Sequence, residues 1–530
     1  MAHAGATTEQ INAQISAGYG LHQKGEHKQA QNLFRSVLKV APKNATALCL
    51  MGACSLQLKD TKRAINFMSK AVKYAPDNAE FISNLGMAYR SEKLFDKALN
   101  CFKQSLAIDN TLTACKINLA LTLKDLKRFD EAVNLMSEVV KSTPNQSGNL
   151  FTYGNLLFEA EKYDEAITAY QSALTNNERY QQLWVNLGNA YKLAGAFDKS
   201  LNAYDKALAL DPNNSAVALN KGLMLLKLGQ LKEGWAHYER RIDLIDFEDK
   251  DLKKINSPLW KGEDLKGKSI IIYTEQGFGD TFQFCRYVSW VKSLGAKVFF
   301  YGSQKIQQIL SSLNGIDQWI AKGSPIPKHD YRISTMSLPN MYLQLQASFP
   351  LTTPYLKAKT EKIEQWKHLF PQQDKLKIGI VWQGNSGYIW DKFRSVNLDA
   401  FLPIILNDKT AVFSLQVDDP YQQLKKLIKT HPEVQDKIVD IGALIKKQGG
   451  TFDDTAGMLA SLDLVISADT SMAHLTGALG YKVYTVLPYI SEWRWGIDGK
   501  SITDYPSMTL FRQKTRNDWN ELMTRVNDTL

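Results

Sequence analysis

The chain has 530 residues, too many for a single hydrophobic core, and 44% of them are hydrophobic and 22% charged, as in ordinary globular proteins. Its formal net charge of +10 favours anionic partners, but the lysines are scattered and no nucleic-acid-binding motif accompanies them, so we expect no nucleic-acid partner. No run approaches the roughly 20 apolar residues that span a bilayer, and the N-terminus lacks a signal-peptide pattern. We therefore predict a cytoplasmic protein without a transmembrane segment.

The cysteines argue against both a disulfide framework and a zinc site. They form an odd and irregularly spaced set: Cys49, Cys54, Cys101, Cys115 and Cys285. We expect a reducing compartment, no cofactor and no bound metal ion.

A period of 34 residues runs through the N-terminal half of the chain. Pro42, Pro76, Pro144 and Pro212 lie at multiples of 34 from one another. In the same frame a small residue is followed four positions later by a bulky one, as close helix packing requires: Ala30 and Phe34, Ala64 and Met68, Ala98 and Phe102, Ala132 and Met136, Ala166 and Tyr170, Ser200 and Tyr204, and Gly234 and Tyr238. This pattern predicts about seven helical hairpins over residues 1–241.

Each predicted hairpin also carries a small residue in its first helix, where the partner helix must approach closely. These residues are Gly18, Gly52, Gly86, Ala120, Gly154, Gly188 and Gly222. The fullest copy of the motif closely resembles the tetratricopeptide repeat, and it consists of Trp184, Leu187, Gly188, Tyr191, Gly195, Tyr204, Ala207 and Pro212. The resemblance implies an all-α superhelix with an extended concave groove for a protein partner.

Four asparagines share the sixth position of their repeats: Asn84, Asn118, Asn186 and Asn220. An asparagine amide both donates and accepts, so a row of them can pair with the backbone of an extended peptide. We therefore predict acceptor binding along this row. The alternative is that asparagine is simply common at this position of such repeats.

After Arg241 the repeat frame ends, and residues 242–267 are a predicted linker. From Ser269 onward, short β-branched and aromatic runs alternate with amphipathic segments, and the pattern restarts at LKIGIVWQG. This predicts two βαβ blocks, at 268–360 and 361–530, the second ending in a helix. Because ligands gather at the carboxyl ends of parallel strands, the residues just after each run are the candidates for a binding site.

The order of motifs in these blocks resembles that of bacterial repeat-containing glycosyltransferases. The motifs are EQGFGDTFQFCRY, WQGN, RS, SLQ, DLVISADTSMAHLTGALG and WRW, with GWAHYERR closing the last repeat. Such enzymes are related to heptosyltransferases and, more distantly, to O-linked N-acetylglucosamine transferase, which carries a similar asparagine row; flagellin glycosyltransferases share the layout. The resemblance covers nearly the whole chain. It implies a two-lobed GT-B fold of two Rossmann-like halves, with the acceptor at 268–360, the donor at 361–530 and no required metal.

Asp280, in EQGFGD, is the candidate catalytic base, because the corresponding aspartate of heptosyltransferases is proposed to act as one. The alternative is purely structural. Asp280 followed by Gln283 also fits a helix N-cap with a capping box. In the same strand-end segment, Gln276 is predicted to face the acceptor.

The segment SADTSMAH delivers a strand end to the start of a helix, where free N–H groups and the helix dipole favour an anion. We predict that this segment binds the donor phosphate through Asp469, Thr470, Ser471 and His474. The alternative is that Asp469 only caps the helix and His474 is a core histidine. No second histidine or cysteine has ligand spacing nearby, so no metal is expected there.

The remaining donor-site candidates lie after other strands of the second block. They are Gln383, Gly384, Asn385, Arg394, Ser395 and Gln416. An arginine at 394 suits a diphosphate or a carboxylate, although Lys392 is an alternative cation and the loop is also typical of an exposed one. Trp493, Arg494 and Trp495 could equally wall the cleft or pack the lobes together.

These patterns favour a metal-independent glycosyltransferase that moves a sugar from a nucleotide donor to Ser or Thr of a protein held by the repeats, plausibly flagellin. The donor stays open among CMP-, UDP- and ADP-linked sugars, including a nonulosonic acid such as pseudaminic acid. Two alternatives remain. One is a heptosyltransferase-like enzyme acting on a lipopolysaccharide-type glycan, and the other is a non-catalytic scaffold with a degenerate transferase domain.

Overall fold

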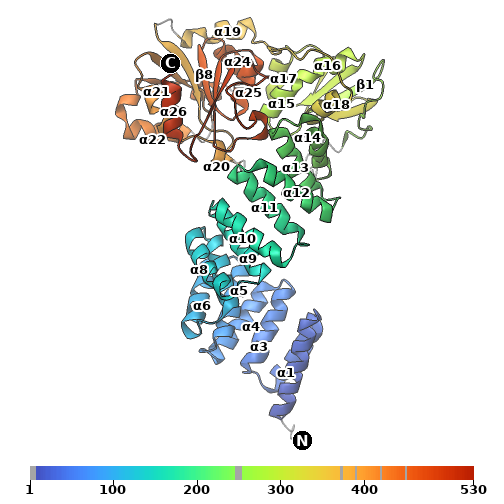
Figure 1. The fold of residues 1–530 in the computed structure, drawn as a ribbon, viewed down its shortest axis with the longest axis vertical. Helices are drawn as coiled ribbons and strands as arrows, with labels where there is room; N and C mark the ends of the chain where they lie inside the picture. Colours follow the sequence, from blue (N-terminus) through green and yellow to red (C-terminus); the bar gives the residue numbers. More distant parts are fainter. Residues whose placement is uncertain (1–6, 245–253, 371–373, 388–390, 418–420, 448–449) are drawn as a thin grey trace. The chain divides into compact units, whose positions relative to one another are not determined.

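The computed structural model describes residues 7–530 apart from 245–253, 371–373, 388–390, 418–420 and 448–449. The chain divides into two compact units, Met1–Pro212 and Asn213–Leu530 (Figure 1). None of the described helices is long and apolar enough to cross a membrane.

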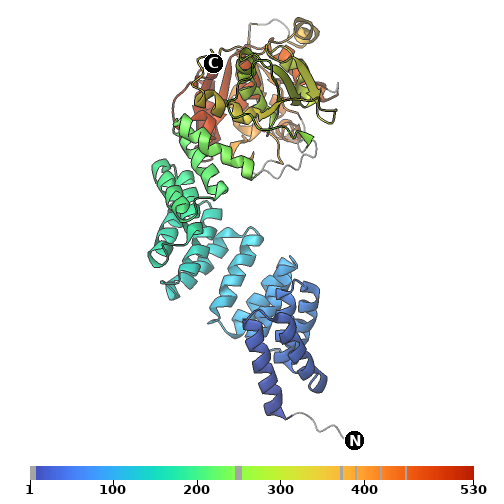
Figure 2. The ribbon, with the colours of Figure 1, turned by 90° about the vertical axis from the view of Figure 1, so that its right-hand side faces the viewer.

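The first unit is built from helical hairpins that follow one another in chain order (Figure 2). Its helices are α1 (Thr8–Gln23), α2 (His27–Val40), α3 (Ala45–Gln57), α4 (Thr61–Tyr74), α5 (Ala79–Ser91), α6 (Phe95–Ile108), α7 (Thr113–Asp125), α8 (Phe129–Ser142), α9 (Ser147–Glu159), α10 (Tyr163–Asn176), α11 (Gln181–Ala194) and α12 (Phe197–Leu210). The all-α prediction for this region is confirmed, and the second unit opens with one more hairpin, α13 (Ser215–Lys227) and α14 (Leu231–Tyr238).

The spacing of 34 reappears in the backbone of the hairpin turns. One residue in each turn has a positive φ: Gly25, Lys59, Lys93, Lys127, Glu161, Gly195 and Gly229. A left-handed residue at this place ends the first helix and reverses the chain. Only three of the seven are glycine, so the turn accepts the modest cost of a side chain in this conformation.

Close packing within each hairpin explains the paired small and bulky residues. A Cβ added to Gly154 would lie 2.5 Å from the ring of Tyr170, and one added to Gly188 would lie 2.6 Å from the ring of Tyr204. Such distances are far below van der Waals contact. The rings fill the space that the glycines leave, which is why the pairs recur.

The second unit contains two parallel sheets. The smaller has the order β3-β2-β1-β4, with β1 (Ser269–Tyr273), β2 (Lys297–Gly302), β3 (Gln318–Ala321) and β4 (Tyr331–Ser334). The helices of this part are α15 (Phe278–Phe284), α16 (Val288–Ser293), α17 (Gln304–Leu310) and α18 (Leu338–Gln344).

The larger sheet has the order β10-β9-β8-β5-β6-β7. Its strands are β5 (Leu376–Val381), β6 (Thr410–Ser414), β7 (Ile438–Asp440), β8 (Leu464–Ala468), β9 (Val483–Leu487) and β10 (Met508–Arg512). Its helices are α19 (Thr360–Trp366), α20 (Asp391–Arg394), α21 (Leu402–Ile405), α22 (Tyr421–Thr430), α23 (Gly442–Lys447), α24 (Phe452–Leu459), α25 (Ser471–Ala478) and α26 (Trp519–Asn527). Every strand pair in both sheets is parallel, so the predicted α/β blocks are confirmed at that level.

The larger sheet is covered on both faces, as parallel sheets require. On one face Ile380 and Ile466 pack with Leu424 and Leu522, from α22 and α26. On the other face Val465 belongs to a core that also takes in residues of α24, α25 and the smaller sheet. The two sheets therefore share one continuous hydrophobic core.

The compact units divide one hairpin earlier than the repeat frame ends. The frame ends at Arg241, whereas the second unit starts at Asn213. The reason lies in the packing of α13 and α14: Leu226, Trp235 and Tyr238 are buried together with Phe284 and Met336 of the α/β part. The last hairpin is thus part of the α/β unit's core.

Candidate functional site

The larger sheet has one topological switch point, between β5 and β8. The chain goes from β5 outward through β6 to β7, then returns to the other side of β5 and continues through β8, β9 and β10. At the carboxyl ends of the two central strands, Val381 is paired with Ser467. Open α/β sheets bind their ligands in the crevice outside such a switch point.

Thr470 begins α25 at this crevice. Its side chain accepts a hydrogen bond from the Met472 N–H at 3.2 Å, and its hydroxyl lies 3.1 Å from the Ser467 hydroxyl. The N-cap of the helix is therefore Thr470, and the alternative that Asp469 caps it is wrong. Ser471 is the first residue of the helix and is half-buried.

Two buried ionisable groups flank this helix start. Burial, with the negative charge of Glu492, raises the pKa of Asp469 to about 6. His474 is also buried, and burial together with the positive charges of Arg494 and Arg394 lowers its pKa well below the usual value, so the imidazole is neutral at pH 7.

His474 has the partners of a core histidine. Its Nδ1 lies 3.2 Å from the Tyr505 hydroxyl, and its ring stacks on Trp495 with the centroids 5.1 Å apart. These contacts match the alternative that the sequence left open. A contact between His474 and a donor stays a prediction.

Asp391 organises the loop on the β5 side of the crevice, and the sequence reasoning missed it. Its carboxylate accepts hydrogen bonds from Gln383 Nε2 at 3.0 Å, Ser395 Oγ at 2.9 Å and Arg394 Nε at 3.2 Å. It thereby joins three predicted donor-site residues. The available signal was a carboxylate three and four positions before the arginine-serine pair, within one turn of the short helix α20.

Gly384 is needed because Arg394 crosses over it. A Cβ at Gly384 would lie 2.5 Å from Arg394 Nη2. Asn385 makes a local turn, since its side-chain oxygen accepts from the Gly387 N–H at 3.0 Å. The side chain of Lys392, the alternative cation, lies outside the described residues.

Gln416, after β6, holds the chain at the end of β5. Its Oε1 accepts from the Trp382 and Gln383 backbone N–H groups at 3.2 and 3.0 Å, and its Nε2 donates to the Gln383 carbonyl at 3.0 Å. These bonds extend the sheet pairing beyond the last strand residue. Gln416 therefore positions the Gln383 loop, and its predicted contact with a nucleotide stays a prediction.

A pocket of about 350 Å³ lies beside this loop. It contains two predicted donor-site residues and adds polar groups from the following loop and α22; its lining is Gln383, Ser395, Val396, Asn397, Asp399, Gln423 and Lys426. Gln423 also donates to Gln383 Oε1 at 2.7 Å. The pocket thus offers amides, a carboxylate and a lysine to a polar ligand.

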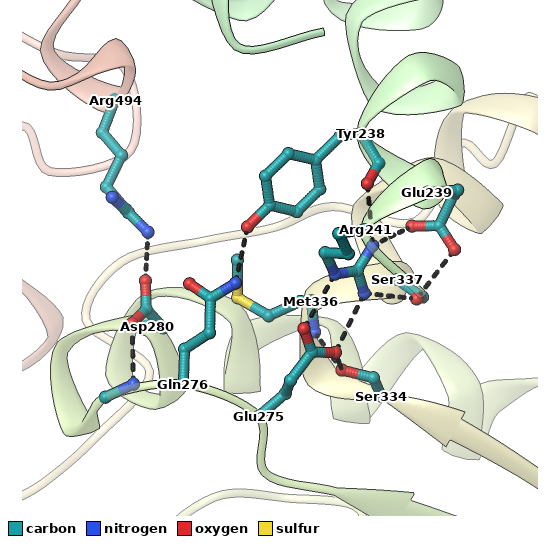
Figure 3. Close-up of polar contacts among 11 residues, drawn as sticks. Tyr238, Glu239, Arg241, Glu275, Gln276, Asp280, Ser334, Met336, Ser337 and Arg494 are labelled. Carbon is teal, nitrogen blue, oxygen red and sulfur yellow. Dashed lines mark hydrogen bonds and ion pairs between the residues drawn. The ribbon is translucent and has the colours of Figure 1, made fainter. Parts of the chain in front are cut away.

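The smaller sheet has its own switch point, between β1 and β4, and a side chain from the last hairpin occupies it (Figure 3). Arg241 binds the Glu275 carboxylate through Nε at 2.8 Å and Nη2 at 3.0 Å. Its Nη2 also donates to Ser337 Oγ at 2.7 Å, and its Nη1 donates to Glu239 at 2.6 Å. Ser334, at the end of β4, donates to Glu275.

Arg241 and Glu275 are both almost fully buried. Burial alone lowers the pKa of Arg241, but the carboxylates of Glu275 and Glu239 outweigh it, and the net shift is upward. The guanidinium is therefore a fixed positive charge. Both residues stand in motifs quoted above, GWAHYERR and EQGFGD, but nothing in the sequence pairs them.

Gln276 contacts the same hairpin. Its φ is 63°, and its Nε2 donates to the Tyr238 hydroxyl at 2.8 Å (Figure 3). The predicted acceptor-side residue is thus held by α14 of the last repeat. Its contact with an acceptor is untested.

Asp280 lies at the third position of α15, whose N-cap is Gly277, so the specific alternative of an Asp280 N-cap with a Gln283 capping box is wrong. Its Oδ2 accepts from the Gly277 N–H at 2.9 Å, and its Oδ1 is paired with Arg494 (Figure 3). Arg494 also donates to Gln283 Oε1 at 3.1 Å. A stabilising role at the helix start is therefore visible in the structure, and a role as base is a prediction.

The WRW segment forms the short helix η8 (Trp493–Trp495) and joins several elements. Trp493 packs edge-on against Trp235 with the ring centroids 5.3 Å apart. Nearby, Lys227 of α13 donates to the carbonyls of Ser491 and Gly496 at 2.7 and 3.1 Å. These contacts support the packing alternative for Trp493, while Arg494 reaches the predicted base.

The predicted acceptor-binding asparagines are half-buried on the first helices of their hairpins. Asn84 Nδ2 donates to Cys49 Sγ at 3.3 Å, and Asn186 Nδ2 donates to Asn155 Oδ1 at 2.7 Å. Asn118 lies on α7 and Asn220 on α13. Peptide binding by this row stays a prediction.

Comparison with known protein families identifies the hairpins. Four models described as tetratricopeptide repeats match residues 21–85, 79–112, 117–180, 151–215 and 203–236. The N-terminal part of the chain consists of tetratricopeptide repeats. Repeats of this kind are typical of proteins that bind other proteins.

Protein FlbA of Caulobacter vibrioides is 25% identical over 340 residues, which are 58% of this chain and 53% of FlbA. The chain therefore spans about half the length of this relative. Among solved structures, PilF of Pseudomonas aeruginosa matches 40% of the chain and 94% of its own at 19% identity with a TM-score of 0.35. YrrB, described as a tetratricopeptide-repeat protein with an unusual peptide-binding site, matches 35% of the chain and 95% of its own at 18% identity with a TM-score of 0.31.

Proposed function

We propose that the chain is a GT-B glycosyltransferase that takes a sugar from a nucleotide donor and transfers it to Ser or Thr of a protein bound by the tetratricopeptide repeats. The observation that carries the proposal is the switch point between β5 and β8. There the start of α25 lies close to two arginines, since Arg394 and Arg494 both influence the pKa of Asp469 and His474. Dipole and guanidinium groups together suit the phosphates of a sugar nucleotide.

In the proposed reaction the acceptor hydroxyl oxygen bonds to the anomeric carbon of the sugar, and the bond from that carbon to the phosphate oxygen breaks. The nucleotide leaves with the electron pair, stabilised by Arg394 and the N–H groups of α25. Asp280 takes the hydroxyl proton. Because Oδ1 of Asp280 is paired with Arg494, this step requires that the acceptor hydroxyl replace the guanidinium at that oxygen.

The test compares Asp280→Asn with Asp528→Asn, a change at an exposed aspartate of the C-terminal end. An asparagine at 280 can still accept from the Gly277 N–H but cannot take a proton, so we expect transfer to fall by 100-fold or more, roughly the contribution of a general base. Transfer is followed as the mass gain of an acceptor protein. Full activity of Asp280→Asn would exclude the base assignment, while Asp528→Asn should behave as the parent.

Donor and acceptor are identified separately. Binding of CMP, UDP or ADP should raise the unfolding temperature, because a ligand that binds only the folded state stabilises it. Failure of all three to do so would favour a scaffold. For the acceptor we propose flagellin, and an unchanged flagellin mass in a strain lacking this chain would refute that proposal.

A further inference from the structure

We propose that His22, His27 and Cys54 form a Zn²⁺ site in the first two hairpins of the repeat array. The Nδ1 atoms of His22 and His27 lie 3.1 Å apart, and Cys54 Sγ lies 3.2 Å from His22 Nδ1. One ligand atom from each residue lies within 4.8 Å of the other two. Two imidazoles and one thiolate are a ligand set typical of zinc.

The turn between α1 and α2 builds this cluster. His22 lies in the last turn of α1, and His27 is the first residue of α2. Gly25, with φ of 82°, reverses the chain between them and allows the two rings to meet, with their centroids 4.9 Å apart. Cys54 approaches from α3, so the cluster joins both hairpins.

The distances fit a tetrahedral ion better than a hydrogen-bond chain. With zinc bonds of about 2.0 Å to nitrogen and 2.3 Å to sulfur, tetrahedral angles place two ligand atoms roughly 3.3–3.6 Å apart. In the structure both short contacts converge on the same atom, His22 Nδ1. A neutral imidazole nitrogen has either one lone pair or one proton, so a single hydrogen bond cannot serve both neighbours.

Repeat packing does not require these residue types. In the second repeat the positions 34 residues later are Leu56, Thr61 and Ala88, and in the third they are Arg90, Phe95 and Thr122. The three potential ligands thus coincide in one repeat of the frame. The cysteine spacing argued against zinc because it compared cysteines only with one another, whereas the fold adds two histidines.

Exposure of the cluster leaves room for a fourth ligand. Cys54 is buried, but both histidines are only half-buried, so water can complete the coordination. Binding converts the Cys54 thiol to a thiolate and releases its proton to solvent. The bound ion would link α1, α2 and α3 at the end of the array, where a terminal repeat has a neighbour on one side only.

The experiment titrates untagged, metal-free full chain with Co²⁺ as a spectroscopic substitute and then with Zn²⁺. We expect one ion per chain, the intense visible bands of four-coordinate Co²⁺ and a thiolate-to-cobalt charge-transfer band, all lost when Zn²⁺ is added. Cys54→Ser should remove the charge-transfer band, whereas Cys101→Ser, a cysteine outside the cluster, should keep it.

His27→Gln provides a second variant if Cys54→Ser fails to fold. Loss of a direct ligand should weaken Zn²⁺ binding more than the roughly 10–100-fold that loss of an outer-shell partner costs. Absence of stoichiometric Co²⁺ binding by the parent chain would overturn the proposal, and so would identical spectra and affinities for the parent and the His27→Gln variant.

Discussion

Replacing Arg241 by methionine tests whether the last repeat is fastened to the α/β unit by a buried ion pair. Arg241 and Glu275 have side-chain exposures of 3% and 8%. Methionine fills much of the arginine volume but leaves the Glu275 carboxylate buried, with Ser334 as its remaining printed partner. Removing one member of a buried ion pair typically costs about 3–5 kcal/mol.

The reverse substitution should cost less, because the pair is asymmetric. In Glu275→Gln the guanidinium keeps Glu239 and Ser337 as partners. We expect a loss of about 1–3 kcal/mol, the range for one missing hydrogen-bond partner of a buried group. The double variant leaves no buried unpaired charge, so its cost should be smaller than the sum of the two single costs.

Hydrogen exchange on the full chain measures these differences without assuming two-state unfolding. A cost of about 3 kcal/mol makes local opening more than about 100-fold more frequent, so the amides of α14 and β1 should exchange correspondingly faster. Arg240→Met is the matched control, because Arg240 is more than one-third exposed and its surface pair with Asp243 is worth less than about 1 kcal/mol. Equal effects of Arg240→Met and Arg241→Met would refute the reasoning, as would strictly additive effects in the double variant.

Three further predictions concern other parts of the chain. Since burial raises the pKa of Asp469 to about 6 from its model value of 3.8, the charged form destabilises the fold by up to about 3 kcal/mol above pH 6; Asp469→Asn should therefore raise the unfolding temperature more at about pH 8 than at about pH 4, and an equal gain at both would contradict this. Gly154→Ala should destabilise the array by about 1–3 kcal/mol by overpacking against Tyr170, whereas Gly148→Ala on the same helix meets nothing within 4 Å and should be neutral or stabilising; thermal unfolding of both distinguishes packing from helix propensity. If the proposed donor site is correct, Asp391→Asn should raise the donor KM about tenfold with a smaller effect on kcat, because it disturbs the loop around the phosphates; an unchanged KM would separate Asp391 from that site.

The repeats were readable from the sequence because their determinants are local. Gly188 and Tyr204 are 16 residues apart and contact each other directly, so the same pair recurs wherever the hairpin recurs. The parallel strands were readable for the same reason, as continuous apolar runs such as DLVIS. The left-handed turn was only partly visible, since Lys93 occupies it as well as Gly195.

The predicted donor residues after β5 and β8 were readable only as strand ends. The order of the strands, which makes β5 and β8 neighbours, came from the fold. Asp391 was missed because a buried acidic residue and an exposed one look alike in sequence. Its role depends on three side chains that converge on it only in the folded loop.

The sequence by itself determined the hairpin array and the alternation of strands and helices, because both follow from periodic contacts between residues close in the chain. The tertiary structure decided which charged groups pair. Asp280 and Arg494 are 214 positions apart, and His22 and Cys54 are 32 apart in different hairpins. No period links such residues, since these pairs depend on how whole elements pack and on which polar groups that packing buries together.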